Sequence, residues 1–244
     1  MAVYVMSDLH GCRHEFNEML KTIQYSSECD ELWIDGDICD RGNESIPLIQ
    51  QIMQDPSMHI IYGNHDVWFA KYAQALIDAK KDPGSIDMSD DLFCWLHYNG
   101  GYRTADQFMD LDYPQCYDIK LYLEENRIFY KYMNVHNRKF LLVHAGLSKE
   151  YLNPSTRLSA VPEEVLVWSH IGIDDNPFPD TTMVVGHMPT FLYGKQYENK
   201  IIHGKNETMF HIDCGCVFGR KLACLRLDDM KEFYVDSTCP YLAV

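Results

Sequence analysis

The stretch Ile34-Asp35-Gly36-Asp37-Ile38-Cys39-Asp40-Arg41-Gly42 decides how the rest of this chain is interpreted. It continues the apolar run Leu32–Ile34 and carries three aspartates, two glycines and an arginine. An apolar run that gives way to clustered acids is typical of a strand that delivers ligands to a site. The carboxylates of Asp37 and Asp40 are suited to two tasks, binding a metal ion and supporting a catalytic base. A solvated acidic turn explains the stretch equally well, so other segments must decide.

Size and charge restrict the classes of protein to consider. The chain has 244 residues, of which 46% are hydrophobic, so we expect a single domain over residues 1–244 with a sizeable core. Its 36 acidic and 21 basic residues give a net charge of −15. Most of such a surface repels duplex nucleic acid and anionic membranes, and neither is an expected partner. Bound metal can neutralise clustered acids, so a cation-rich site remains compatible with this charge.

Nine scattered cysteines indicate the cellular compartment. They form no Cys-x-x-Cys pair, and an odd number of this kind suits reduced, mostly buried thiols in a cytoplasmic protein. The chain opens directly on a strand-like run, which predicts that no signal peptide is present. No apolar run approaches the ~20 residues of a membrane-spanning helix.

Strand and helix patterns alternate along the first 81 residues. The expected strands are Val3–Met6, Leu32–Ile34 and Ile60–Tyr62, and the expected helices cover residues 16–23, 46–53 and 66–81. This order is typical of a largely parallel sheet with crossover helices. Residues 82–117 interrupt the alternation after the breaker Asp82-Pro83-Gly84-Ser85, and they predict a helical insertion that shapes a substrate pocket. A second hydrophobic lobe without substrate contact is the alternative.

The second half of the chain predicts further strands. Ile128–Tyr132 and Lys139–Val143 read as antiparallel neighbours, and Met183–Val185 as another strand. Short alternating runs near residues 200–203, 207–213, 221–227 and 231–235 are expected to extend a second sheet.

Five apolar runs end in glycine close to His, Asp or Asn. The segments are Asp8-Leu9-His10-Gly11, Gly36-Asp37, Gly63-Asn64-His65, His144-Ala145-Gly146 and Gly186-His187. Ligands bind beyond the carboxyl ends of strands in open α/β sheets, so these side chains are expected to meet. Nitrogen and oxygen ligands without thiolate favour Mn²⁺, Fe or Zn²⁺. Six candidate ligands suit two ions about 3.5–4 Å apart rather than one. The histidines outside these segments, including His211, are predicted to be structural. His170 is the exception, and its role is left open.

Together with Asp40-Arg41-Gly42 and Asp66, the five segments resemble the calcineurin-like metallophosphoesterases. The resemblance is closest to the phosphoprotein phosphatase branch, which includes bacterial serine/threonine phosphatases and symmetrical dinucleoside tetraphosphatases. It covers Ser7 to about Val235. The fold that it implies is α/β, with two mixed sheets packed as a sandwich and flanked by helices, plus the helical insertion.

The resemblance also implies roles for individual residues. The implied ligands of two divalent ions, with manganese favoured over iron or zinc, are Asp8, His10, Asp37, Asn64, His144 and His187. His65 is the implied general acid, which Asp40 orients and keeps cationic. Arg41 and Asn64 are the implied phosphate-binding groups. His170 stands where many bacterial relatives place an arginine, and it is a candidate substrate contact, a pocket residue or a structural residue.

The expected activity is hydrolysis of phosphate monoesters by direct attack of a metal-bridging hydroxide. A protein phosphatase acting on phosphoserine and phosphothreonine is the first expectation, with phosphorylated protein or peptide as substrate. Hydrolysis of a dinucleoside tetraphosphate such as diadenosine tetraphosphate is the alternative enzyme, in which aromatic residues of the insertion stack on adenine. A non-catalytic metal-binding scaffold is the alternative from another class.

Overall fold

Alternate residues of β1 (Val3–Met6) face two hydrophobic layers in the computed structural model, which describes residues 1–239. Val3 and Val5 point into the layer between two sheets, whereas Tyr4 and Met6 point toward the helices. This division follows from the two-residue period of a strand, which places successive side chains on opposite faces. The protein is therefore a sandwich of two sheets with helices on its outer side, as expected.

The described residues form two mixed sheets of five strands each. The first has the order β10-β9-β1-β2-β3, with β2 at Glu31–Asp35, β3 at Met58–Ile61, β9 at Lys221–Arg226 and β10 at Lys231–Asp236. The second has the order β4-β5-β6-β8-β7, with bounds Lys131–Val135, Arg138–Leu142, Thr182–Val185, Met209–His211 and Ile202–His203. Strands β1, β2 and β3 are parallel, as are β5, β6 and β8.

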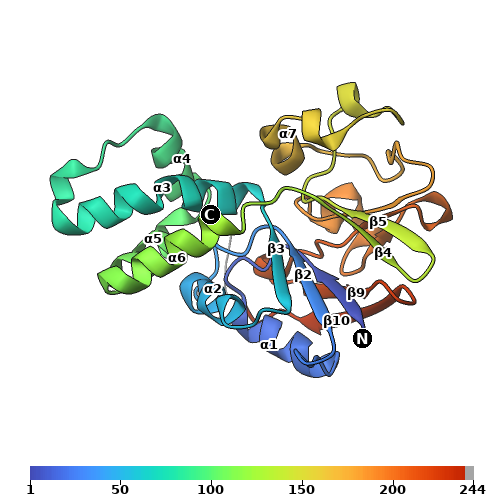
Figure 1. Cartoon of the computed structure of the whole chain (residues 1–244), viewed down its shortest axis with the longest axis horizontal. Helices are drawn as coiled ribbons and strands as arrows, with labels where there is room; N and C mark the ends of the chain where they lie inside the picture. Colours follow the sequence, from blue (N-terminus) through green and yellow to red (C-terminus); the bar gives the residue numbers. More distant parts are fainter. Residues whose placement is uncertain (240–244) are drawn as a thin grey trace.

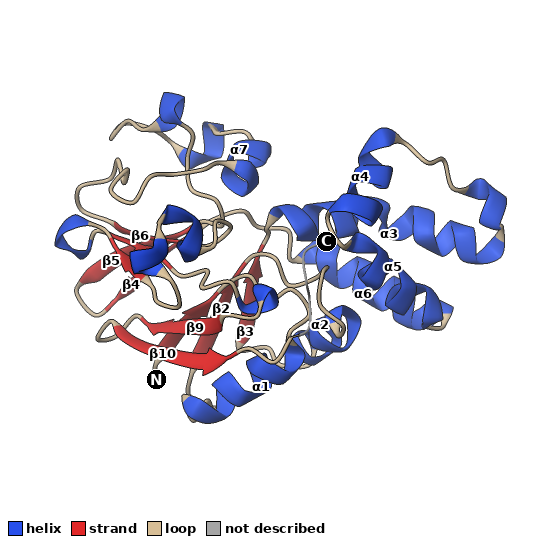
Figure 2. Ribbon diagram, turned by 180° about the vertical axis from the view of Figure 1, so that it is seen from behind, coloured by secondary structure: helices blue, strands red, loops and turns tan. Residues whose placement is uncertain are grey.

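Seven α-helices are present in the described part of the chain. Their bounds are Arg13–Thr22 (α1), Ser45–Met53 (α2), Asn64–Lys81 (α3), Asp90–Tyr98 (α4), Gly101–Asp110 (α5), Tyr113–Glu125 (α6) and Glu163–Trp168 (α7). Short 3₁₀ turns lie at Pro83–Ser85, Lys149–Tyr151, Leu158–Ala160, Thr190–Tyr193, Lys195–Tyr197, Lys205–Glu207 and Cys216–Phe218. Helices α1 and α2 lie against the first sheet, while α3 to α6 extend to one side of both sheets (Figures 1 and 2).

Two expectations about the strands are wrong. The segments near residues 221–227 and 231–235 join the first sheet and not the second, because β9 pairs antiparallel with β1. Alternation marks a strand, but it does not say which edge the strand covers. The strand predicted from Ile128 begins only at Lys131. Ile128 instead extends the end of β3, because its carbonyl accepts the N–H of Tyr62 at 2.7 Å.

The segment 82–117 folds as helices, and α6 continues to Glu125. It packs on α3 through a buried aromatic cluster that includes Phe69, Trp95 and Phe108. A single domain over residues 1–244 stays a prediction, and residues 240–244 lie outside the described part. Within residues 1–239, no helix combines the length and the apolar character needed to cross a membrane.

Candidate dinuclear metal centre

Five loops meet where β1, β2, β3, β5 and β6 end. The loop after β1 is joined to the loop after β2, because the N–H groups of Asp8 and His10 donate to the carbonyls of Gly36 and Asp37 at 3.0 and 2.8 Å. The loop after β6 joins them, since the N–H of His187 donates to Asp8 Oδ2 at 3.0 Å. The convergence expected from parallel strand ends is therefore present, and it spans both sheets.

Asp37 lies at the centre of this convergence. Its Oδ2 is 3.6 Å from His10 Nε2 and 3.4 Å from His144 Nε2, and all three side chains are buried. Its Oδ1 accepts the N–H of His65 at 3.0 Å, which fixes the rotation of the carboxylate. One oxygen placed between imidazoles from opposite sheets has the geometry of a bridging ligand.

Backbone carbonyls orient two of the imidazoles. His10 Nδ1 lies 2.8 Å from the carbonyl of Cys39, and His144 Nδ1 lies 2.8 Å from the carbonyl of Asp35. A carbonyl only accepts, so each Nδ1 carries a proton and each Nε2 is the ring nitrogen turned toward Asp37. Metal-binding histidines are commonly oriented in this way.

The residues present fit a metal centre. Asn64 Oδ1 and His144 Nε2 are buried and lack a hydrogen-bond partner among the described residues. Buried polar atoms normally have a partner, and a bound cation would supply one for each of these atoms. Donor atoms of Asp37, His144 and His187 lie within 4.8 Å of one another, as do those of Asp37, His10 and His65. Four of the sequence-predicted ligands, His10, Asp37, His144 and His187, thus lie in these two groups. Asp8 is held beside them through His187, and Asn64 is the first residue of α3.

The charges of the ligands also suit cation binding. Burial alone raises the pKa of Asp37, but His144, His65 and His10 outweigh it and hold that pKa well below its usual range. Burial, aided by the charge of His144, lowers the pKa of His187 to about 3. Asp37 is therefore ionised and His187 is neutral, which are the forms in which these side chains bind metal.

The loop backbone at the site is strained. The residues with positive φ are Asp8 (53°), His10 (43°), Asp37 (55°), Asp40 (72°), Arg41 (64°) and His187 (66°). Left-handed conformations are uncommon outside glycine and gather at functional sites. Gly36 has a φ of 85°, and no other residue fits at this position, because a Cβ would collide with the His144 ring.

A second buried unit adjoins the ligands. Asp40 Oδ2 lies 2.7 Å from His65 Nδ1, and both side chains are fully buried. Two residues of the insertion hold the carboxylate: Trp95 Nε1 donates to Oδ2 and Thr104 Oγ1 donates to Oδ1, each at 2.6 Å. Nothing in the sequence indicated Trp95 or Thr104, because partners 55 and 64 residues away follow no local pattern.

The two candidate phosphate contacts beyond the ligands lie on opposite sides. Arg41 reaches His10 Nε2 and lies over the Phe218 ring, with 5.5 Å from its guanidinium carbon to the ring centroid. His170 is exposed, and its ring centroid is 5.6 Å from that of His187. Arg41 is therefore on the His10 side of the centre and His170 on the His187 side.

Two aspartates have positions that the sequence did not indicate. Asp66 Oδ2 accepts the N–H groups of Asp37 and Gly63 at 2.8 and 2.9 Å, and its Oδ1 accepts that of Ile38 at 3.0 Å. It therefore ties the loop after β2 to the start of α3. The side chain of Asp35 is fully buried rather than a source of exposed negative charge, and burial raises its pKa to about 8.

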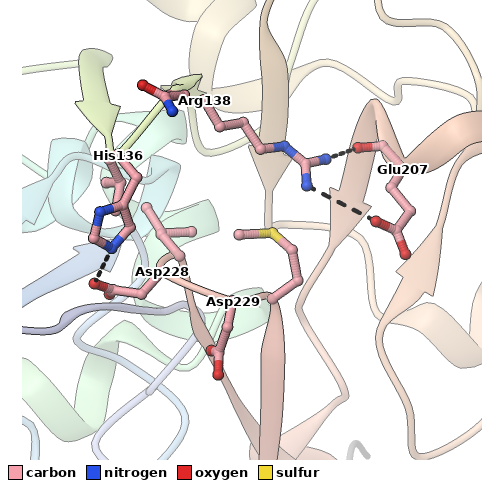
Figure 3. Close-up of a pocket in the computed structure, with 9 residues that line it drawn as sticks. His136, Arg138, Glu207, Asp228 and Asp229 are labelled. Carbon is pink, nitrogen blue, oxygen red and sulfur yellow. Dashed lines mark hydrogen bonds and ion pairs between the residues drawn. The ribbon is translucent and has the colours of Figure 1, made fainter.

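A hollow at the other end of the sheets takes no part in this centre. It lies near the start of β5 and the β9–β10 turn (Figure 3), and its lining includes His136, Arg138, Glu207, Asp228 and Asp229. Its cations are already paired with acids: His136 Nε2 lies 3.2 Å from Asp228 Oδ1, and Arg138 contacts Glu207. The candidate metal ligands therefore all lie at the opposite ends of the strands, away from this hollow.

A helix-flanked sandwich with histidine, aspartate and asparagine donors at five strand ends defines a metallophosphoesterase, a hydrolase acting on phosphoric ester bonds. The chain belongs to the calcineurin-like phosphoesterase family, whose model matches residues 1–219. The symmetrical bis(5'-nucleosyl)-tetraphosphatase of Aromatoleum aromaticum is 23% identical, with 96% of this chain and 97% of that protein aligned.

Two solved structures share the fold. A crystal structure provisionally assigned as a diadenosine tetraphosphatase superposes with a TM-score of 0.63 at 18% identity, covering 97% of this chain and 93% of the other. A serine/threonine phosphatase from Saccharomyces cerevisiae, similar to human PP5, gives a TM-score of 0.64 at 13% identity, covering 100% and 82%. At these identities the likeness concerns the fold alone.

Proposed function

We propose that this protein hydrolyses dinucleoside tetraphosphates symmetrically, using two divalent ions. Manganese is the first choice of metal, with iron or zinc as alternatives, since the donors are nitrogen and oxygen. Asp8, His10 and Asp37 would hold one ion, and Asn64, His144 and His187 would hold the second together with Asp37. When bound, such ions activate water and neutralise phosphoryl charge.

His65 is proposed to give a proton to the leaving oxygen. Its Nδ1 is held by Asp40, while its buried Nε2 has no hydrogen-bond partner among the described residues and is free to serve the substrate. His65 also lies within metal-ligand range of His10 and Asp37. We assign it as the acid because a buried carboxylate side chain orients its ring through Nδ1, whereas backbone carbonyls orient His10 and His144 with Nε2 toward Asp37.

The observation that supports a nucleotide substrate is the pair of exposed aromatic residues beside Arg41. The N–H of Arg41 donates to the carbonyl of Gly100 at 3.2 Å, so the α4–α5 turn lies against the arginine. Tyr98 and Tyr102 flank this turn with 75% and 46% of their surface exposed. Stacking on an aromatic ring contributes about 1–3 kcal/mol per base. A base on this surface would place its phosphates toward Arg41.

The lengths of the relatives favour the same substrate. Proteins named symmetrical bis(5'-nucleosyl)-tetraphosphatase align with 96% of this chain and with 97% or 98% of their own length. The first expectation from sequence is a protein phosphatase acting on phosphoserine and phosphothreonine. That activity would use the same dinuclear metal centre. The serine/threonine phosphatase that superposes on this chain is 13% identical, so its likeness concerns the fold alone.

A substrate panel tests the proposal. Manganese-loaded protein should convert diadenosine tetraphosphate into two molecules of ADP and should act poorly on phosphoserine and phosphothreonine peptides. Tyr98→Ala and Tyr102→Ala should each raise KM for the dinucleotide about tenfold, because a stacking surface is lost. Tyr113→Ala is the matched control, since Tyr113 is exposed but lies beside Lys80 and Lys81 at the far end of α3.

Three outcomes would contradict the proposal. Turnover of phosphopeptides alone identifies a protein phosphatase, and release of ATP with AMP shows asymmetric cleavage. A protein that binds metal but hydrolyses neither these substrates nor p-nitrophenyl phosphate is a scaffold, and His65→Asn would then leave its binding behaviour unchanged.

A further inference from the structure

Three cysteines from separate segments of the chain gather with a glutamate at the start of α1. Cys12 directly precedes α1, Glu15 lies in its first turn, and Cys216 begins the 3₁₀ turn Cys216–Phe218. The Sγ atoms of Cys12 and Cys216 and a carboxylate oxygen of Glu15 lie within 4.8 Å of one another. All three side chains are at most 3% exposed. Thiols from separate segments therefore share one buried place with an acid.

The C-terminal segment brings a third thiol to this cluster. The side chain of Cys239 interacts with the Cys12 thiol, as does that of Cys216. Glu15 Oε1 accepts both the N–H and the hydroxyl of Thr238, at 2.6 and 2.8 Å, and these bonds hold the segment next to α1. One oxygen of Glu15 is thereby oriented, which leaves Oε2 for another partner.

Glu15 is a buried acid without a compensating cation. Among residues 1–239 no lysine, arginine or histidine forms an ion pair with it, although the described part of the chain contains many such pairs. A buried carboxylate is costly unless a cation or hydrogen bonds neutralise it. Three thiols beside it supply soft donors, so the group as a whole matches a divalent, thiophilic metal ion.

We propose that Cys12, Cys216, Cys239 and Glu15 form a structural zinc site, separate from the dinuclear centre. Zinc in structural sites is four-coordinate and accepts both thiolate and carboxylate ligands. With Zn–S bonds of about 2.3 Å, ligand atoms of a tetrahedral site lie roughly 3.8 Å apart. The donors of Cys12, Glu15 and Cys216, which lie within 4.8 Å of one another, would need to close by about 1 Å, and Cys239 would join them from beside Cys12.

Such a site would join three functional segments. Cys12 follows His10 by two residues, so an anchored Cys12 fixes the loop after β1. Cys216 lies two residues before Phe218, on whose ring the Arg41 guanidinium rests. The zinc would thus hold the first ligand loop, the support of the phosphate-binding arginine and the C-terminal segment in one arrangement.

Cobalt substitution tests the site, because the dinuclear centre contains no thiolate. Co²⁺ added to the wild-type protein should produce the ultraviolet charge-transfer absorption of a cobalt–thiolate bond, with one equivalent saturating it. Cys12→Ala and Cys216→Ala should each abolish this absorption. Cys29→Ala should keep it, since Cys29 is an exposed cysteine in the loop before β2, and so should His187→Ala. Absence of the band in the wild type, or its persistence in the Cys12 and Cys216 variants, overturns the proposal.

Metal counting is a second measurement that does not depend on cobalt. After zinc loading and removal of free ions, elemental analysis should find one ion per chain fewer in Cys216→Ala than in the wild type. Circular dichroism identifies a variant that has failed to fold. In that case the presence or absence of the cobalt–thiolate band in the wild-type protein decides whether the site exists. Equal zinc content in folded wild-type and Cys216→Ala protein overturns the site, whatever the substrate of the dinuclear centre.

Discussion

Asp40 Oδ2 lies 2.7 Å from His65 Nδ1, with neither side chain exposed to solvent. The carboxylate comes from the loop after β2 and the imidazole from the first turn of α3. Trp95 and Thr104 of the insertion hold the carboxylate from the far side. The insertion therefore positions a proposed catalytic pair as well as offering aromatic surface.

Asp40→Asn tests this pair. The amide no longer holds the His65 ring as the carboxylate does, so proton donation is misaligned and kcat for diadenosine tetraphosphate should fall by roughly 10²–10⁴. The fall should be much smaller for p-nitrophenyl phosphate, whose leaving group needs no proton. Steady-state kinetics with both substrates measure the difference. Asp106→Asn, at an exposed site on α5, is the control. Equal losses on both substrates would show that His65 is not the acid.

Asp37→Asn should lower the metal content, whereas Asp35→Asn should not. The Asp37 carboxylate lies between His10 and His144, and a neutral amide there cannot serve two ions. Burial raises the pKa of Asp35 to about 8, so its side chain is mainly neutral at pH 7 and asparagine resembles it. Elemental analysis of the two dialysed variants makes the comparison. Equal metal loss in both would contradict a bridging role specific to Asp37.

Asp66→Ala should destabilise the fold. The substitution leaves the N–H groups of Asp37, Ile38 and Gly63 without their acceptor in a buried place. Each buried donor left without a partner costs about 1–3 kcal/mol, so the loss of three acceptor contacts should lower the unfolding free energy by at least roughly 3 kcal/mol. Urea unfolding measures it. Asp78→Asn, exposed on the same helix, should change it by less than about 0.5 kcal/mol.

His211 should make stability depend on pH in mild acid. Burial lowers its pKa from 6.5 to about 4, so the unfolded chain binds the proton first as pH falls. Its contribution to the unfolding free energy is therefore complete above about pH 6.5 and decreases between pH 6.5 and 4, by up to roughly 3 kcal/mol. Urea unfolding of His211→Leu should show a shallower dependence over this window. His14→Gln, an exposed control, should follow the wild type.

The sequence alone determined the strand-end motifs that meet at one place, and its resemblance to a known family implied the sandwich of two mixed sheets. Its motifs succeed because parallel strands place their carboxyl ends together, so a ligand after each strand needs no long-range information. The solvated-turn interpretation of residues 34–42 is wrong for the same reason, since Asp37 and Asp40 are buried among partners from the other loops.

Long-range packing decided the rest. Four features depend on contacts between distant segments. They are the sheet that β9 joins, the hydrogen bonds from Trp95 and Thr104 to Asp40, the burial of Asp35, and the cluster of Cys12, Cys216 and Cys239. Local periodicity carries the secondary structure of a segment, but not which other segment will cover it. Asp40 illustrates the difference between the two sources. The sequence indicated it as a candidate site residue beside Asp37, and only the tertiary structure revealed that Trp95 and Thr104 hold its carboxylate.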